Sequence, residues 1–100
     1  MPPVALALLL ACLTGSPIAT ADANDNAYLS GLRANGISVT SPAGIIEFGH
    51  RICASLDSGT PSRAMAESMI PVFHLTGSQA AFWVGDAIGS YCPWHSNDSF

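Results

Sequence analysis

The sequence predicts an all-α protein, a small bundle of about four short helices that follows a cleaved signal peptide and is held by one disulfide. Three observations favour this fold class. Apolar residues recur at helical spacing in four segments after residue 22, helix start and stop signals bound these segments, and none shows the sustained alternation of a strand. The 100-residue chain is long enough for one domain only.

Residues 1–21 have the pattern of a secretory signal peptide. Residues 4–13 form an unbroken apolar run, and the small-residue motif Ala19-Thr20-Ala21 follows it. An apolar helix of that length spans about 15 Å, half of a bilayer core. We therefore expect cleavage after Ala21 and a mature form that is secreted or associated with the cell envelope, without a membrane span. Lipidation at Cys12 is a minor alternative.

The first helix of the mature domain, residues 22–93, is predicted over residues 26–35. Tyr28, Leu29 and Leu32 share one face of it, and Gly36 follows as a helix stop. Residues 37–40 alternate between apolar and polar side chains, which indicates a short extended link.

The second helix is predicted over residues 42–57. Ser41 supplies its N-cap and Pro42 its first helical position. Glu47 and Arg51 lie four residues apart, in the order that favours an ion pair on a helix surface. Its apolar stripe consists of Ile45, Phe48, Ile52 and Leu56.

Two further helices complete the prediction. Thr60-Pro61 starts a short third helix that Pro71 ends. The apolar linker that follows, with Val72, Phe73 and Leu75, is expected to be buried beneath the domain, and an exposed surface patch is the alternative. Thr76 and Gln79 form a capping box that starts the fourth helix, which continues to Cys92. Residues 94–100 show no periodicity and are predicted to form a mobile tail.

Cys53 and Cys92 are the two cysteines that remain after signal removal. In an exported protein such a pair favours a disulfide. The bridge brings the two Cα atoms to about 5.5 Å, closer than helices with bulky side chains allow. Gly49 on the second helix and Gly85 and Gly89 on the fourth are predicted to provide the room.

Zinc is the alternative for the same sulfurs, because His50 and His95 each lie three residues from one cysteine and complete a Cys2His2 set. An oxidising compartment favours the disulfide, so we expect no metal and no cofactor. A small hydrolase or metal-dependent enzyme would have to use His50, His74 or His95. No set of acid, base and nucleophile survives the disulfide, so we predict no catalytic residues and no enzyme activity.

The charge pattern excludes a nucleic-acid partner. The chain has three basic and seven acidic residues, a formal net charge of -4, and therefore no basic patch. Met65, Met69, Phe73 and Trp83 would line a ligand groove where they do not simply fill the core, which is their more frequent role. We expect a non-enzymatic binding module with an unknown protein or envelope ligand as its partner. A lipid or haem carrier with an apolar cavity is the alternative.

Three motifs follow one another between residues 28 and 93. They are Tyr28-Leu29-x-x-Leu32 up to Gly36-Ile37, then Gly49-His50-x-x-Cys53-x-x-Leu56-Asp57-x-Gly59, then Ala81-Phe82 up to Tyr91-Cys92-Pro93. In this order and spacing they resemble the domain of unknown function 732 family, small exported proteins of mycobacteria and their relatives. The resemblance implies a small helical, disulfide-linked protein, secreted or at the cell envelope, and implies no established activity or catalytic residues.

Overall fold

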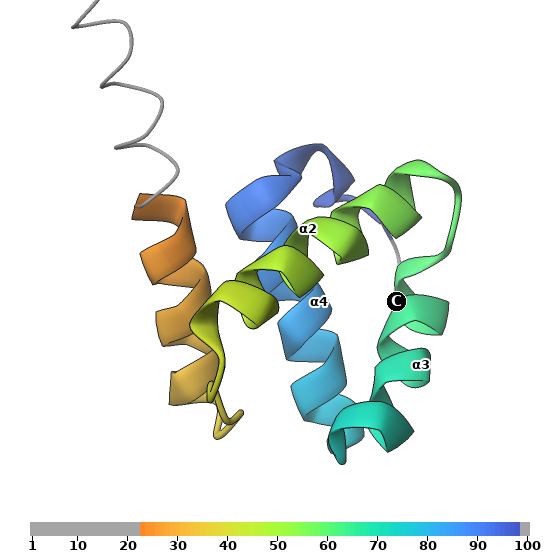
Figure 1. Ribbon diagram of the computed structural model, residues 1–100. Coiled ribbons are helices and arrows are strands. Elements are labelled where there is room, and N and C mark those ends of the chain that lie inside the picture. The colour runs from red at the N-terminus through yellow and green to blue at the C-terminus, as the bar shows by residue number, and fades with distance from the viewer. Residues whose placement is uncertain (1–22, 99–100) are drawn as a thin grey trace, which may run out of the picture.

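A computed structural model describes residues 23–98. These residues form four α-helices and one short 3-10 helix, with no strand among them (Figure 1). The predicted all-α class and the number of helices are confirmed. The predicted signal peptide and Cys12 lie outside the described residues.

Most helix bounds agree with the sequence signals. The first helix spans residues 23–34 and so starts earlier than predicted, whereas α2 spans Pro42–Asp57 as expected. Then come α3 (Ser62–Phe73), α4 (Gly77–Tyr91) and the 3-10 helix η1 (Pro93–His95). None of the helices within residues 23–98 is long and apolar enough to cross a membrane.

α4 occupies the centre of the bundle. In Figure 1, α2 crosses in front of α4, with the first helix on one side and α3 on the other. The first helix, α2 and α3 each pack their apolar face against α4, and together the four helices form one shared core. The largest side chains that are fully buried in it are Trp83, Tyr28, Leu32, Ile52 and Met69.

α3 continues through Pro71, where the sequence predicted a break. Proline lacks the N–H that would bond to the carbonyl four residues back, but Pro71 lies in the last turn, where only one such bond is lost. The helix ends at His74, whose backbone has the left-handed conformation (φ 56°, ψ 49°). Val72 therefore lies on α3 with 67% of its surface exposed, and the prediction that it is buried in a linker is wrong.

Two of the predicted helix N-termini, those of α2 and α4, differ in their caps. The Gln79 N–H donates to Thr76 Oγ1 at 3.1 Å and the Thr76 N–H donates to Gln79 Oε1 at 3.0 Å, so the predicted capping box is confirmed. Ser41 occupies the N-cap position of α2, but its side chain makes no cap hydrogen bond. Pro42 at the first helical position sets the start of α2.

The predicted disulfide joins Cys53 on α2 to Cys92 at the end of α4, with 5.9 Å between the Cα atoms. The prediction that Gly49, Gly85 and Gly89 provide room for the disulfide is wrong. A Cβ at Gly85 or Gly89 would meet nothing within 4 Å, because both lie on an exposed part of α4. Gly49 is tightly packed, but against the rings of Tyr28 and Tyr91.

The segment after Cys92 has a defined structure where no regular structure was predicted. The Trp94 indole N–H donates to Asp57 Oδ1 at 2.9 Å, and His95 Nε2 lies 2.7 Å from the same oxygen. His95 Nδ1 also lies 2.8 Å from Asp98 Oδ2. These contacts hold η1 against the end of α2 as far as Asp98.

Candidate functional site

A surface groove lies where the link after the first helix meets α2 and the corner between α3 and α4. It consists of two adjoining pockets, both open to solvent, that share Thr40, Ile45 and Phe73. The linker pocket, of about 340 Å³, lies between the link and the α3–α4 corner. The α2 pocket, of about 390 Å³, continues along the first half of α2.

The two pockets differ in chemistry. The polar side chains of the linker pocket are those of Ser38, Thr40, His74 and Gln79. Its apolar side chains are those of Ile37, Ile45, Phe73, Leu75 and Trp83. Phe48 lines the α2 pocket together with Glu47 and Arg51, which form the ion pair that the sequence predicted, at 2.8 Å.

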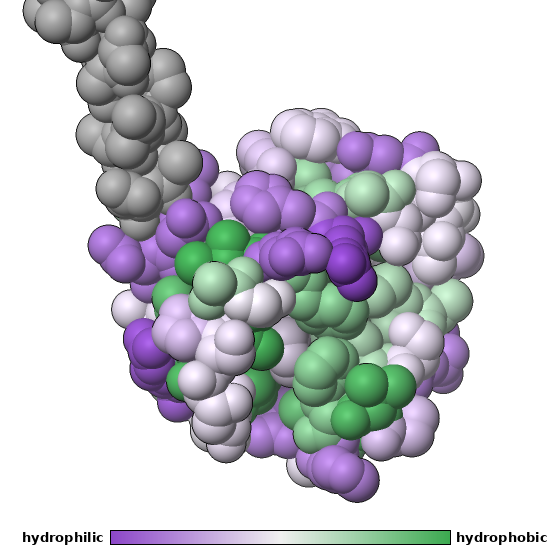
Figure 2. Space-filling model, viewed as in Figure 1, coloured by the Kyte–Doolittle hydropathy of each residue, from purple (hydrophilic) through white to green (hydrophobic). Residues whose placement is uncertain are grey.

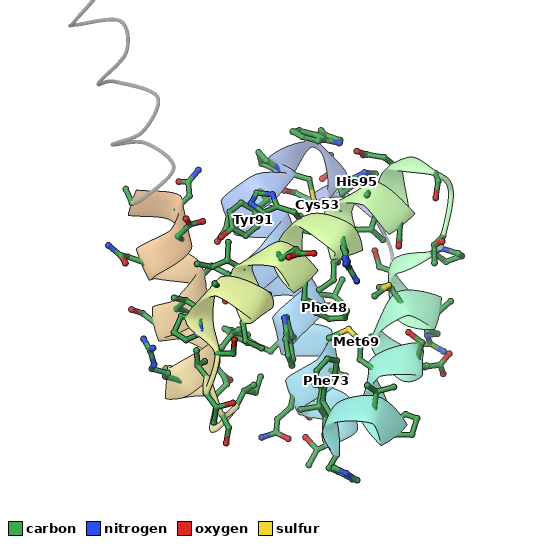
Figure 3. The ribbon with its side chains drawn as sticks, in the orientation of Figure 1. Phe48, Cys53, Met69, Phe73, Tyr91 and His95 are labelled. Atoms are coloured by element: carbon green, nitrogen blue, oxygen red, sulfur yellow. A yellow bond between two sulfur atoms is a disulfide. The ribbon has the colours of Figure 1, made fainter. Side chains whose placement is uncertain are left out.

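Three aromatic rings form the wall of the groove. The ring centroids of Phe48 and Phe73 lie 5.1 Å apart, and those of Phe73 and Trp83 lie 4.8 Å apart. In Figure 3, Phe48 on α2 and Phe73 on α3 point toward one another. Trp83 is only 1% exposed, whereas Phe48 and Phe73 are half-buried. Figure 2 shows apolar surface between α2 and α3 on this face.

Two consecutive hydrogen bonds on the buried side of the groove hold its wall in place. The Trp83 indole N–H donates to the Tyr28 hydroxyl at 2.6 Å, and that hydroxyl donates to the Ile45 carbonyl at 3.0 Å. Burial raises the pKa of Tyr28, so its hydroxyl keeps the proton that it donates. Trp83 and Ile45 are therefore held in place by one buried tyrosine of the first helix.

Hydrogen bonds also fix the start of the link, residues 37–40. Gly36 ends the first helix with φ at +74°, a conformation that glycine adopts without strain. The Gln79 side chain accepts from the Thr76 N–H and donates to the Asn35 carbonyl at 3.2 Å. One glutamine therefore caps α4 and ties the start of the link to it.

His74 lies at the corner between α3 and α4 and is exposed. Among the described residues it alone is a non-glycine residue with a positive φ. The side chains of His74, Ser38 and Thr40 make no hydrogen bond or ion pair with the part of the chain that the structure describes. The linker pocket thus carries three polar side chains that are free to bond to a ligand.

The four predicted groove residues do not line one site. Met69 and Trp83 are each 1% exposed and belong to the core, and Met65 is packed against it. Phe73 lines both pockets and Trp83 borders the linker pocket. The groove is therefore displaced from the methionines toward the link and α2.

The histidines do not converge on the sulfurs as the zinc alternative requires. The His50 ring stacks on Tyr91 with 4.0 Å between centroids, and His95 lies between two aspartates. Across residues 23–98, no group of three or more His, Cys, Asp or Glu side chains could hold a metal ion. The three histidines lie at separate places, with His74 at the α3–α4 corner.

One pair of ionisable groups and one partly buried carboxyl group lie outside the groove. Hydrogen bonds from Trp94 and from His95 lower the pKa of Asp57, and the bond to Asp57 raises the pKa of His95. Burial raises the pKa of Asp86 on α4 to about 6. Asp86 Oδ2 is buried and has no hydrogen-bond partner among the described residues. Asp86 borders the first helix, where a Cβ on Gly31 would lie 2.8 Å from Oδ2.

The sequence pattern predicts structural roles, in the core or in the link, for most groove residues. Ile45 and Phe48 were assigned to the apolar stripe of α2, although both are only partly buried. Ser38 and Thr40 were placed in the link without a role. The alternation in the link was the one local signal, because it predicts that these hydroxyls share a side of the chain.

The fold and the site define a small all-α protein held by one disulfide, with an open groove on its surface. The profile of the family described as "Protein of unknown function (DUF732)" matches residues 24–94. The chain belongs to this family, and the resemblance in the motifs is confirmed.

Relatives occur in mycobacteria. The chain is 33% identical over 95 residues to the uncharacterized protein Mb1323c of Mycobacterium bovis, covering 95% of this chain and 86% of the relative. It is 31% identical over 79 residues to the uncharacterized protein Rv1271c of Mycobacterium tuberculosis, covering 79% and 70% of the two chains. No solved structure matches the chain significantly.

Proposed function

We propose that this protein is an exported, non-enzymatic binding module of the cell envelope or the extracellular space, and that the groove is its binding site. The groove carries the proposal. It combines half-buried aromatic rings with free polar side chains, the mixture that is typical of ligand sites. The bonds made by Tyr28 and Gln79 hold its walls in place without a ligand, which lowers the entropic cost of binding.

A lipid or haem carrier is the second candidate. An apolar cavity closed to solvent would favour it, but the linker pocket and the α2 pocket are both open. The apolar surface around Phe48 and Phe73 supports contact with part of an apolar ligand rather than its enclosure.

Amide chemical-shift mapping tests the binding role. The protein purified from its exported fraction would be titrated with an apolar dye, with phospholipid vesicles and with soluble saccharides. We expect at least one class to shift amides of the link, the start of α2 and the α3–α4 corner. Thr40 belongs to both pockets, so Thr40→Trp should block that response. Ser30→Trp, on the exposed surface of the first helix, is the matched control.

If none of the three ligand classes shifts groove amides, the binding role is wrong. The same holds if Ser30→Trp impairs binding as much as Thr40→Trp does.

Mass spectrometry tests the export part of the proposal. The full chain would be expressed in a mycobacterial host, and the protein in the culture medium and cell wall would be weighed. Cleavage after Ala21 and the loss of two protons to the disulfide should appear in one mass. A protein found only inside the cell, with residues 1–21 intact, would contradict export.

A further inference from the structure

We infer that the linker pocket binds a neutral sugar ring. The inference rests on the proposed binding function and names its ligand class. Three features of the pocket carry it: its charge, its free polar groups and its partly exposed aromatic ring.

The first feature is that no acidic residue, lysine or arginine among residues 23–98 lines the linker pocket. No aspartate, glutamate, lysine or arginine is among the described residues that line the linker pocket, whereas Glu47 and Arg51 line the adjoining α2 pocket. A charged ligand would lose water on entering the linker pocket and find no opposite charge there. The pocket therefore favours an uncharged ligand, and its volume of about 340 Å³ suits a single ring.

The second feature is the kind of polar group. The hydroxyls of Ser38 and Thr40 each donate and accept hydrogen bonds, and the imidazole of His74 adds a further N–H donor. None of them bonds to another part of residues 23–98. Sugar hydroxyls also donate and accept, so they match these groups without any charge. A purely apolar ligand would leave all three unused.

The third feature is the ring of Phe73. This side chain is half-buried and packs against the rings of both Trp83 and Phe48, and its remaining exposed surface borders the linker pocket. The C–H groups of a pyranose can contact this exposed apolar surface while its hydroxyls bond to the polar side chains. Ile45 extends the apolar floor, and the Tyr28 hydroxyl holds the Ile45 carbonyl in place.

The backbone of His74 gives independent support. Glycine or asparagine usually occupies the left-handed position that ends a helix, because other residues are strained there. Here the position holds a histidine, with φ at 56°, at the rim of the linker pocket. The imidazole makes no hydrogen bond, ion pair or ring contact with residues 23–98. A role of the imidazole in binding accounts for its presence.

Titration with matched saccharides tests the inference. The probes are the methyl pyranosides of glucose, mannose and galactose, with glucuronic acid and glucosamine as charged analogues of the same shape. We expect at least one neutral glycoside to shift amides of residues 36–40 and 73–75, and both charged analogues to bind about tenfold more weakly or not at all.

His74→Gly separates binding from folding. The variant should melt at the same temperature as the parent or higher, because glycine relieves the backbone strain. Its affinity for the glycoside should fall about tenfold, the effect of losing one hydrogen bond to the ligand. Ser38→Ala should also weaken binding, while Ser30→Ala, outside the pocket, should not.

The outcomes distinguish the inference from the proposed function. If the apolar dye or the vesicles bind the groove and no neutral glycoside does, the sugar inference is overturned and the binding module stands. If glucuronic acid binds as well as the glucoside, the pocket does not select an uncharged ring and the sugar inference is overturned. If no probe shifts any groove amide, both proposals fail.

Discussion

Gly49 lies against Tyr28 so closely that a Cβ at position 49 would come within 2.8 Å of the tyrosine Cζ. Tyr91 lies 2.9 Å from the same point, on the opposite helix. Real Cβ atoms do not approach rings this closely, so α2 can cross the first helix and α4 at this distance only with glycine at the contact. The crossing also sets the position of Tyr28, which holds Trp83 and Ile45 at the groove.

Gly49→Ala should therefore destabilise the protein. Tyr28 is fully buried and Tyr91 is half-buried, so the two rings cannot both move without shifting a helix, and we expect a loss of about 1–3 kcal/mol in the free energy of unfolding. Urea denaturation measures it. Gly85→Ala is the matched control, because it adds the same methyl group to a helix glycine with open space around it. That variant should gain about 1 kcal/mol from helix propensity. Equal effects of the two substitutions would contradict the packing explanation.

Features specified by neighbouring residues could be predicted from the sequence. The start of α2 follows from Ser41-Pro42, and the start of α4 follows from the capping box of Thr76 and Gln79. The disulfide was predicted from the number of cysteines and from the predicted signal peptide.

Features set by helix crossing could not be predicted. Asp57 and His95 are 38 residues apart, and no local pattern pairs them. Gly49, Gly85 and Gly89 look alike in the sequence, yet only Gly49 faces another helix closely. The groove depends on where the link passes α2 and the α3–α4 corner, so its residues come from four separate segments.

The disulfide should contribute a large share of the stability. It joins residues 39 positions apart, and closing a loop of that length in the unfolded chain stabilises the folded state by about 4 kcal/mol on the chain-entropy model. Cys53→Ser with Cys92→Ser should lower the melting temperature strongly, and reduction of the parent protein should have a similar effect. Melting curves of the parent under oxidising and reducing conditions check this. Unchanged curves would show that the bridge adds little.

Asp86 should make stability depend on pH. Its pKa is about 6 in the folded state, above the value of about 3.9 expected for an unfolded chain. Between these values the folded protein binds more protons than the unfolded chain, so the free energy of unfolding should fall as the pH rises from about 4 to about 6. Above that interval the contribution of Asp86 should stay constant.

Asp86→Asn isolates this contribution from that of the other carboxyl groups. The variant avoids a buried carboxylate without a partner, so it should be more stable than the parent at pH 7 and lose the advantage as the pH falls toward 4. Urea denaturation of both proteins across this range gives the difference. A difference that is the same at every pH would rule out titration of Asp86 as its source.

His95 should hold η1 most firmly when it is protonated. Protonated imidazole donates to both Asp57 and Asp98, whereas neutral imidazole has one N–H and donates to only one of them. The pKa of His95 is raised above the ordinary value of about 6.5, chiefly by Asp57. Its stabilising effect is therefore complete below pH 6.5 and is lost as the pH rises through the folded-state pKa.

An NMR titration of the His95 ring protons measures this pKa, and two variants assign its cause. Asp57→Asn should lower the pKa of His95 more than Asp98→Asn does, because the bond to Asp57 is the larger cause of the shift. Amide exchange of residues 94–98 should become faster as His95 loses its proton, after correction for the intrinsic effect of pH. Trp94, 66% exposed and bonded to the same carboxylate, should report the change in its fluorescence. If Asp57→Asn leaves the pKa of His95 unchanged, the carboxylate of Asp57 does not hold this segment.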